Sequence, residues 1–255
     1  MRSWNVPPVP WRNAVVGFVT LLALLVVPSQ RARASILEGL AGWEGDTHQQ
    51  GYGFVGIGAL VPAGSHLIVP IRLSGSYLYY NYDSTGTTLF VKSPGASLMA
   101  GVRVTGKRGS ASALAGGEFR WEHRESGAIG GPARDATASG IVVQADGDLA
   151  VASRWRAFVF GNYAGAAKYL FGRGAVRYQA TNLDWKRPNS FFIGAEAVRQ
   201  GNNESDAAQG GGFLELNFVP QHISVGLHGG YKEIWSPGQA HRAGGYFGTS
   251  LYRRF

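Results

Sequence analysis

The chain has 255 residues, of which 38 are glycine, 16% are charged and none is cysteine. The lack of cysteine excludes a disulfide scaffold and a cysteine-based zinc site. A 45% share of hydrophobic residues with 12% aromatics argues against intrinsic disorder. The formal charge of +8 comes partly from four arginines near the N-terminus, and the other basic residues are scattered. Because nucleic-acid binding needs a clustered basic surface, we expect no nucleic-acid partner.

The N-terminal residues carry the features of a secretory signal peptide. Two arginines flank a short polar start, an apolar run follows from residue 14 to residue 27, and residues 32–34 are Ala-Arg-Ala, with small residues where a signal peptidase reads them. The alternative is a membrane anchor, but this run spans only about 21 Å of helix against a hydrocarbon core of about 30 Å. We therefore predict a signal peptide at 1–34, cleaved before Ser35, and one domain over 35–255.

The rest of the chain alternates with a period of two, as half-exposed β-strands do. Between Leu67 and Tyr80 the odd-numbered positions are mostly apolar or aromatic, whereas Arg72, Ser74 and Ser76 share the other face. Similar segments recur along the chain, and together they predict twelve strands. These lie near residues 36–45, 51–61, 67–80, 89–105, 111–123, 139–151, 155–164, 169–181, 190–200, 209–219, 222–233 and 242–255.

The connections between these segments tend to alternate in length. Short turns are predicted at 62–65, 106–109, 152–154, 186–189 and 220–221, and longer links at 83–88, 124–138, 201–208 and 234–241. Two further links, at 46–50 and 165–168, are short and break the pattern. An even number of strands, with short turns at one end and longer loops at the other, is typical of outer-membrane barrels. We therefore predict an all-β fold, an antiparallel transmembrane β-barrel of about twelve strands.

Three features favour a membrane barrel over a soluble sandwich, which would show the same alternation. The signal peptide directs the chain outward, and Phe255 lies at the end of the last strand, as in many bacterial outer-membrane barrels. Tyrosine and tryptophan also gather near strand ends, as interfacial girdles require. They are Trp43, Tyr52, Tyr77, Tyr79, Trp121, Trp155, Tyr163, Tyr231 and Trp235. We expect the protein in the outer membrane of a Gram-negative cell, in contact with its lipid.

If the apolar faces meet lipid, the opposite faces line the lumen and carry a balanced set of charges. The set is Arg72, Arg103, Glu118, Arg120, Glu122, Asp146, Asp148, Arg173, Arg177, Glu196, Glu215 and Lys232. Unpaired charges in a narrow lumen are costly, so we predict a salt-bridged filling that holds the barrel shut. A polar conduit for a hydrophilic molecule is the alternative. Five aromatic residues near these faces could stack on sugar rings or pack the lumen: Tyr80, Phe158, Phe160, Phe171 and Phe192.

The sequence offers no catalytic or cofactor motif. The glycine-rich tract at 53–58 lies inside a predicted strand with no helix after it, unlike a nucleotide-binding loop. His222 and His228 would lie about 20 Å apart along one strand, too far to share a metal ion. No GxSxG serine elbow is present. We expect no catalytic residue, no cofactor and no metal, although the sequence alone cannot place a serine relative to a histidine.

Several short glycine- and aromatic-rich motifs resemble those of a known family. They are Trp43-Glu44-Gly45, the tract GYGFVG at 51–56, GSYLYYNY at 75–82, Gly194-Ala195-Glu196-Ala197 with Gly201-Asn202, and SVGLHGGY at 224–231. In order and spacing they make the chain similar to the cellulose biosynthesis protein BcsS family. The resemblance implies a non-enzymatic outer-membrane accessory to cellulose production or polysaccharide export, with cellulose or its synthesis machinery as a partner. The loop at 124–138 is then the longest candidate contact surface, although the favoured interpretation of this stretch is simply a flexible extracellular loop.

Two other functions stay open at this point. The first is a narrow porin-like channel for small hydrophilic solutes, which a polar lumen would suit. The second is a lipid-modifying outer-membrane enzyme, which would need a serine and a histidine within hydrogen-bond distance.

Overall fold

The structure is a computed structural model that describes residues 36–84, 86–127, 133–182, 189–237 and 240–255. The described residues form twelve strands and one short 3-10 turn (Val219–Gln221). The strands are β1 (Ile36–Asp46), β2 (Gly51–Pro62), β3 (Leu67–Ser84), β4 (Thr87–Gly106), β5 (Gly109–Ser126), β6 (Arg134–Ala150), β7 (Trp155–Ala164), β8 (Tyr169–Asn182), β9 (Ser190–Gly201), β10 (Asp206–Phe218), β11 (Ile223–Trp235) and β12 (Arg242–Arg254). The predicted signal peptide at 1–34 lies outside these residues.

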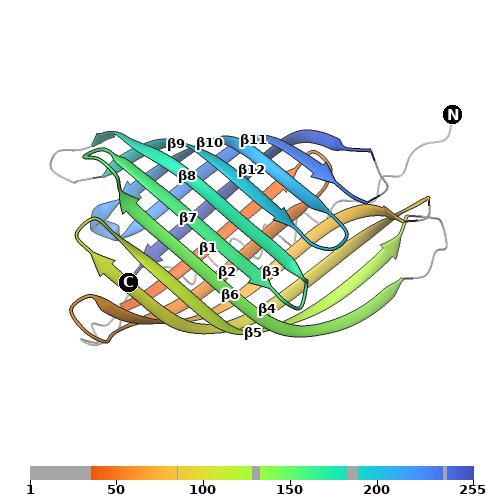
Figure 1. Cartoon of the computed structure of the whole chain (residues 1–255), viewed down its shortest axis with the longest axis horizontal. Helices are drawn as coiled ribbons and strands as arrows, with labels where there is room; N and C mark the ends of the chain where they lie inside the picture. Colours follow the sequence, from red (N-terminus) through yellow and green to blue (C-terminus); the bar gives the residue numbers. More distant parts are fainter. Residues whose placement is uncertain (1–35, 85, 128–132, 183–188, 238–239) are drawn as a thin grey trace. The chain divides into compact units, whose positions relative to one another are not determined.

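Each strand pairs antiparallel with the next, and β1 pairs with β12, so the sheet closes into a barrel (Figure 1). The closing pair runs in register from Glu38 opposite Arg254 to Asp46 opposite Tyr246. Closure pairs strand edges that would otherwise expose N–H and C=O groups. The predicted all-β barrel and its strand number are confirmed. No helix in the described residues is long and apolar enough to cross a membrane.

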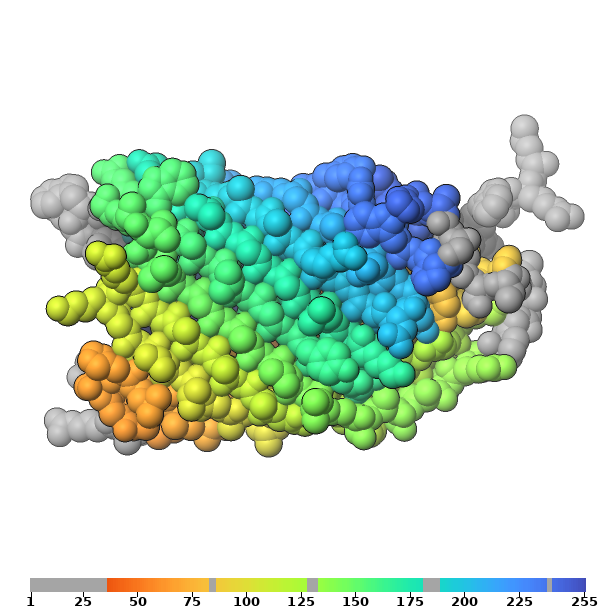
Figure 2. All heavy atoms as spheres, in the orientation of Figure 1, coloured from red at the N-terminus to blue at the C-terminus, as the bar shows by residue number. Residues whose placement is uncertain are grey.

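Successive residues of a strand face the outside and the lumen in turn. On the outside, Leu98 is 59% exposed and Ile141 is 65% exposed, whereas their neighbours Met99 and Val142 are buried on the inside. The strands follow one another side by side across the outer surface, from β6 to β11 in Figure 2. A wall whose outward side chains are large and apolar suits contact with lipid tails better than contact with water.

Aromatic side chains flank this apolar outer face. Tyr77 and Trp121 are exposed toward one end of the barrel, and Trp155 is exposed toward the other. Beyond Tyr77, the outer side of β4 and β5 becomes charged, where Lys92 and Glu125 form an ion pair at 2.8 Å. This order, from aliphatic through aromatic to charged, is the one found where a membrane barrel leaves the bilayer.

The assignment of Tyr52 to the aromatic girdle is wrong. Its ring lies in the lumen and stacks on Tyr169 of β8, with the ring centroids 6.5 Å apart. The cause is parity, because Tyr52 shares the even-numbered inner face of β2 with the buried Leu60. A position near the end of a strand does not by itself set which face a side chain occupies.

Strand length, more than loop length, distinguishes the two ends of the barrel. We call the end that carries the start of β1 and the finish of β12 the terminal end, and the other the loop end. Strands β3 to β6 have 18, 20, 18 and 17 residues, whereas β7 has 10. The extra residues extend the loop end, since the last residue of β7, Ala164, already pairs with Val142 of β6. Strands β3 to β6 therefore form a tall wall (Figure 1).

Three of the predicted long links are wrong, because the strands run further than alternation alone suggests. β3 and β4 are joined by residues 85–86, where Gly86 adopts a φ of 80° that favours glycine in a tight turn. The link at 124–138 shrinks to 127–133, since His123 and Asp135 pair across β5 and β6 at 2.5 Å. The link at 201–208 shrinks to 202–205.

The remaining links agree better with the sequence. The turns predicted at 62–65, 106–109, 152–154 and 220–221 and the link at 234–241 match the observed connections to within two residues at each end. The turn predicted at 186–189 lies largely outside the described residues. Part of 124–138, the candidate contact surface, lies outside them as well.

Candidate functional site: the filled lumen and its mouth

The twelve charged residues predicted for the lumen lie on the inner side of the wall. Five of them are more than nine-tenths buried: Arg72, Glu118, Arg120, Glu196 and Lys232. Charges that are this deeply buried are tolerated only when they are paired and hydrogen-bonded. The structure brings them together in separate groups at different levels of the barrel.

The group nearest the terminal end is centred on Glu38. The side chain of Glu38 is 1% exposed and accepts a hydrogen bond from Arg72 at 2.7 Å. Arg103 lies 3.7 Å from its second oxygen, and the Tyr252 hydroxyl donates to the same oxygen at 3.3 Å. One carboxylate from β1 thus holds side chains from β3, β4 and β12. This group ties the strands on both sides of the closing seam.

A second group lies on the other side of the terminal end. Arg177 reaches Glu215 at 2.5 Å and Asp148 at 2.5 Å, so it bridges β6 and β10. Asp148 also accepts from Arg156 at 2.6 Å. The Arg177 guanidinium lies 5.0 Å from the ring centre of Phe192, a cation–π contact. Planar guanidinium groups suit such bridging because they present several donors in a fixed plane.

A third group lies along β5 and contains Glu118, Arg120 and Glu122. Arg120 donates to Glu118 at 2.5 Å and to the Ser93 carbonyl at 2.8 Å. It also donates to the Ser76 hydroxyl at 2.7 Å. Glu122 accepts from its inner-face neighbour Arg124. Asp146, which lies on β6, accepts from the Ser112 hydroxyl of β5 at 2.7 Å.

The fourth group, in the middle of the lumen, joins β8 to β12. Arg173 lies 2.5 Å from Glu196, and the Tyr246 hydroxyl donates to Glu196 at 2.8 Å. The His228 ring stands between Glu196 and Glu44, at 3.9 and 3.7 Å from their oxygens. These contacts link β1, β8, β9, β11 and β12 through the interior of the barrel.

Closer to the loop end, the inner face carries two further contacts of this kind. Lys232 pairs with Asp46 at 2.7 Å. Gln209 donates to Glu44 at 2.6 Å. The three charged groups at this level, Lys232, Asp46 and Glu44, therefore have partners on the inner face.

The mouth at the loop end is crossed by contacts between distant strands. β2 and β8 lie opposite each other in the ring of strands, yet Tyr52 and Tyr169 stack. Glu204, in the turn between β9 and β10, accepts from the Tyr80 hydroxyl of β3 at 2.7 Å. It also lies 3.1 Å from Arg124 of β5. The turn therefore reaches over to the tall wall.

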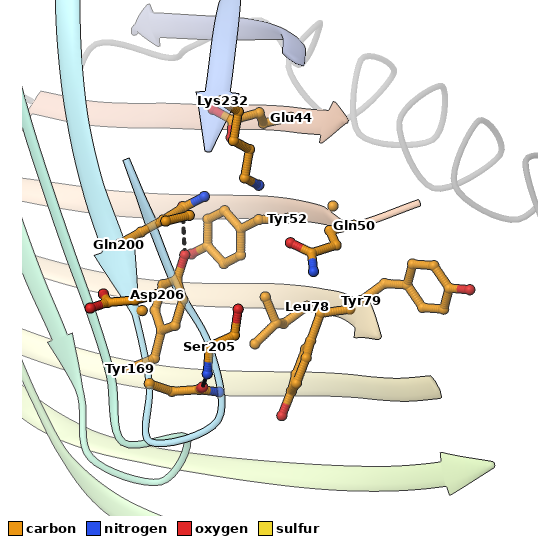
Figure 3. Close-up of a pocket in the computed structure, with 15 residues that line it drawn as sticks. Glu44, Gln50, Tyr52, Leu78, Tyr79, Tyr169, Gln200, Ser205, Asp206 and Lys232 are labelled. Atoms are coloured by element: carbon orange, nitrogen blue, oxygen red, sulfur yellow. Dashed lines mark hydrogen bonds between the residues drawn. The ribbon is translucent and has the colours of Figure 1, made fainter. Parts of the chain in front are cut away.

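Beneath this turn lies a small chamber, drawn in Figure 3. Its lining includes Gln50, Tyr52, Tyr80, Tyr169, Gln200 and Ser205, and its volume is about 50 Å³. Figure 3 shows the Tyr169 hydroxyl bonded to Gln200, with the Tyr52 ring beside them and the Tyr79 ring directed away. A space of this size holds a few water molecules.

The aromatic residues noted near the lumen take part in its filling. Tyr80 is held by Glu204, and Phe192 and Phe158 lie against Arg177 and Arg173. Phe160 and Phe171 meet edge to face, with ring centres 5.7 Å apart. In this structure they pack against protein groups.

Sequence reasoning missed several members of these groups. Glu38, Glu44, Asp46, Arg124 and Arg156 occupy the same inner parity as the residues that were predicted, so alternation could have found them. Glu204 carried no such signal, because it lies in a turn and its partners are on distant strands. Among the described residues, no three histidine or acidic side chains are grouped as metal ligands.

A comparison with known protein families identifies the family of this chain. The family described as cellulose biosynthesis protein BcsS matches residues 42–255, from the middle of β1 to the last residue. This chain belongs to that family. The comparison with curated proteins found no match.

Solved structures support the fold. The β domain of the Bordetella autotransporter BrkA superposes with a TM-score of 0.56 at 11% identity, covering 87% of this chain and 99% of that one. The translocator domain of the autotransporter NalP from Neisseria meningitidis gives a TM-score of 0.53 at 15% identity, covering 95% and 96%. At such identities the likeness concerns the fold alone. The BcsS family member is thus a closed barrel of the outer-membrane type.

Proposed function

We propose that this chain is a non-enzymatic outer-membrane accessory of cellulose biosynthesis. Membership of the BcsS family over residues 42–255 carries the proposal. The apolar outer face with its aromatic borders supports residence in a bilayer. The likeness to autotransporter barrels supports the outer membrane as that bilayer.

The proposed orientation follows from the ends of the barrel. Barrels of this type keep their chain termini and short turns in the periplasm, which places the terminal end there. The tall wall of β3 to β6 then rises from the outer surface of the cell. It carries the charged outer side chains Lys92, His123, Glu125 and Asp135 into water. In this orientation the loop end faces the exported polymer.

The filled lumen favours an accessory over a diffusion pore. Buried ion pairs occupy the terminal end around Glu38 and the middle around Glu196. The mouth is crossed by Tyr52, Tyr169 and Glu204. A hydrated solute would have to break several buried charge pairs to pass, at a cost of several kcal/mol for each charge left unpaired. We assign no catalytic role to any side chain.

A deletion strain tests the proposal. The gene is removed, and extracellular cellulose is measured by dye binding that cellulase treatment abolishes. We expect cellulose that is reduced or fails to stay attached to cells, and recovery when the wild-type gene is restored. The complementing protein should lie in the outer-membrane fraction and migrate faster unboiled than boiled on a denaturing gel. Unchanged cellulose, or a soluble periplasmic protein, would refute the proposal.

A further inference from the structure

The turn between β9 and β10 is built as a rigid unit. The Asn202 side chain accepts from the backbone N–H groups of Glu204 and Ser205, both at 2.9 Å. The Asn202 N–H in turn donates to the Ser205 carbonyl at 2.8 Å. An Asn that hydrogen-bonds the backbone two and three residues on fixes a turn without help from neighbouring elements. The turn therefore keeps its own shape at the end of the β9–β10 ladder, whose last pair is Gly201 with Asp206.

Glu204 projects from this turn and is its link to the tall wall. It accepts from the Tyr80 hydroxyl at 2.7 Å and lies 3.1 Å from Arg124. Arg124 is oriented by Glu122 and by the Tyr82 hydroxyl, to which it donates at 2.7 Å. Tyr80 lies just beyond the last β2–β3 pair, Gly51 with Tyr79, and Arg124 lies at the same level on β5. The extra residues of β3 and β5 in the tall wall thus hold Glu204 of the turn.

The link between Glu204 and the wall is reachable by water. The side chains of Arg124 and Glu204 are 36% and 27% exposed, whereas the Glu38 side chain near the terminal end is 1% exposed. Water screens a partly exposed pair and solvates both groups when it parts. This contact is therefore suited to open and close, unlike the deeply buried pairs below it.

The chamber under the turn has the chemistry of a site for a neutral polar ring. The charged groups that line it are already paired: Lys232 with Asp46, Glu44 with Gln209, and Asp206 with Arg199. The rest of the lining includes the stacked rings of Tyr52 and Tyr169 and the amides of Gln50 and Gln200. Each amide already makes one hydrogen bond, Gln200 with the Tyr169 hydroxyl and Gln50 with the Asn81 carbonyl, and keeps its other polar atom for a ligand. Tyrosine faces pack against the apolar C–H faces of a sugar ring, and amides exchange hydrogen bonds with its hydroxyl groups.

We propose that the Glu204 turn (residues 202–205) is a lid over a binding site for one pyranose unit of a neutral glucan chain. The inference rests on the proposed function, which supplies the glucan. With the lid closed, the chamber of about 50 Å³ admits only water. Release of Glu204 from Tyr80 and Arg124 widens the opening of the chamber and makes room for the sugar.

The first experiment measures whether the lid covers the chamber. The chain has no cysteine, so Gln200→Cys provides a single thiol under the turn in the refolded mature barrel. We expect maleimide to label this thiol about tenfold faster when Glu204→Ala is added, since the open state gains population. Glu125→Ala is the matched control, because it removes an exposed carboxylate on the outer side of the tall wall. Equal labelling with and without Glu204 would overturn the lid.

The second experiment measures the ligand. Cellohexaose binding is followed by calorimetry in the cysteine-free barrel. We expect Glu204→Ala to bind about tenfold more tightly than the wild type, because the closed state lowers apparent affinity, and Tyr169→Ala added to it to abolish binding. If Glu204→Ala fails to fold, Tyr80→Phe releases one of the same contacts. Faster thiol labelling without saccharide binding would overturn the assignment of the ligand. A normal deletion strain would instead count against the proposed function.

Discussion

The two ends of the lumen are both closed by polar side chains, yet they are closed in different ways. Near the terminal end Glu38 is almost fully buried and faces two arginines and a tyrosine. At the mouth, Glu204 is partly exposed and meets one arginine and one tyrosine. Breaking a buried pair leaves an uncompensated charge, whereas water takes over the partners of an exposed pair. The group around Glu38 is therefore a permanent filling, whereas the contact of Glu204 at the mouth is suited to open and close.

Removal of Glu38 should have the largest effect on stability. Glu38→Ala leaves Arg72 and Arg103 without their buried carboxylate, which costs about 3–5 kcal/mol of unfolding free energy. Urea unfolding of the refolded barrel in detergent micelles measures this loss. Glu125→Ala, which breaks a pair with a 43% exposed carboxylate, is the control and should lose about 1 kcal/mol or less. Similar losses in the two variants would remove the distinction between the ends.

Glu196 occupies the middle of the lumen, and its substitution, like that of Glu38, should lower the unfolding free energy. Glu196→Gln keeps the shape but removes the charge that faces Arg173, and we expect a loss of about 1–3 kcal/mol. The unfolding midpoint in urea is the readout. Arg173→Met in the same chain should recover part of the loss, because it removes the unpaired charge. A double variant no more stable than Glu196→Gln would show that this pair is not the source of the effect.

Substitutions at the mouth should lower the unfolding free energy only slightly but should strongly raise the solvent access of the chamber. Tyr80→Phe deletes one hydrogen bond to Glu204, so we expect a loss of about 0.5–1.5 kcal/mol. The same variant should raise the labelling rate of a thiol at position 200. A stability loss as large as that of Glu38→Ala would mean that the mouth belongs to the permanent filling.

The smallest effect is expected on the outer surface at the loop end. Arg199 pairs with Asp206 at 2.5 Å, but the two side chains are 61% and 48% exposed. Arg199→Ala should therefore change the unfolding free energy by less than about 1 kcal/mol. High salt should reduce even this difference, because ions screen exposed pairs. A loss above that of Tyr80→Phe would contradict the ranking by burial.

The sequence was sufficient for the features that depend on alternation. A period of two places Arg72, Glu118 and Glu196 on one face and Leu98 and Ile141 on the other, so the wall and its two faces could be predicted. Alternation does not say which strands oppose each other across a closed ring. For that reason the Tyr52–Tyr169 stack and the reach of Glu204 to Tyr80 could not be predicted.

The ends of the strands also could not be predicted from the sequence. Whether β5 continues past residue 123 and β6 begins before residue 139 depends on cross-strand contacts such as that of His123 with Asp135, which no single segment reveals. The same holds for the turn at 85–86, where both strands run almost to the reversal. Polar stretches rich in glycine resemble loops in the sequence even where pairing extends them into strands.

The central claim is that this barrel is held shut by its own buried charges. Its most direct test is the conductance of the refolded mature chain in a planar lipid bilayer. We predict no stable conductance for the wild type, and none for Glu204→Ala, since the groups around Glu38 and Glu196 still fill the lumen beneath the lid. A steady ohmic current through the wild-type protein would contradict the account and support a narrow channel.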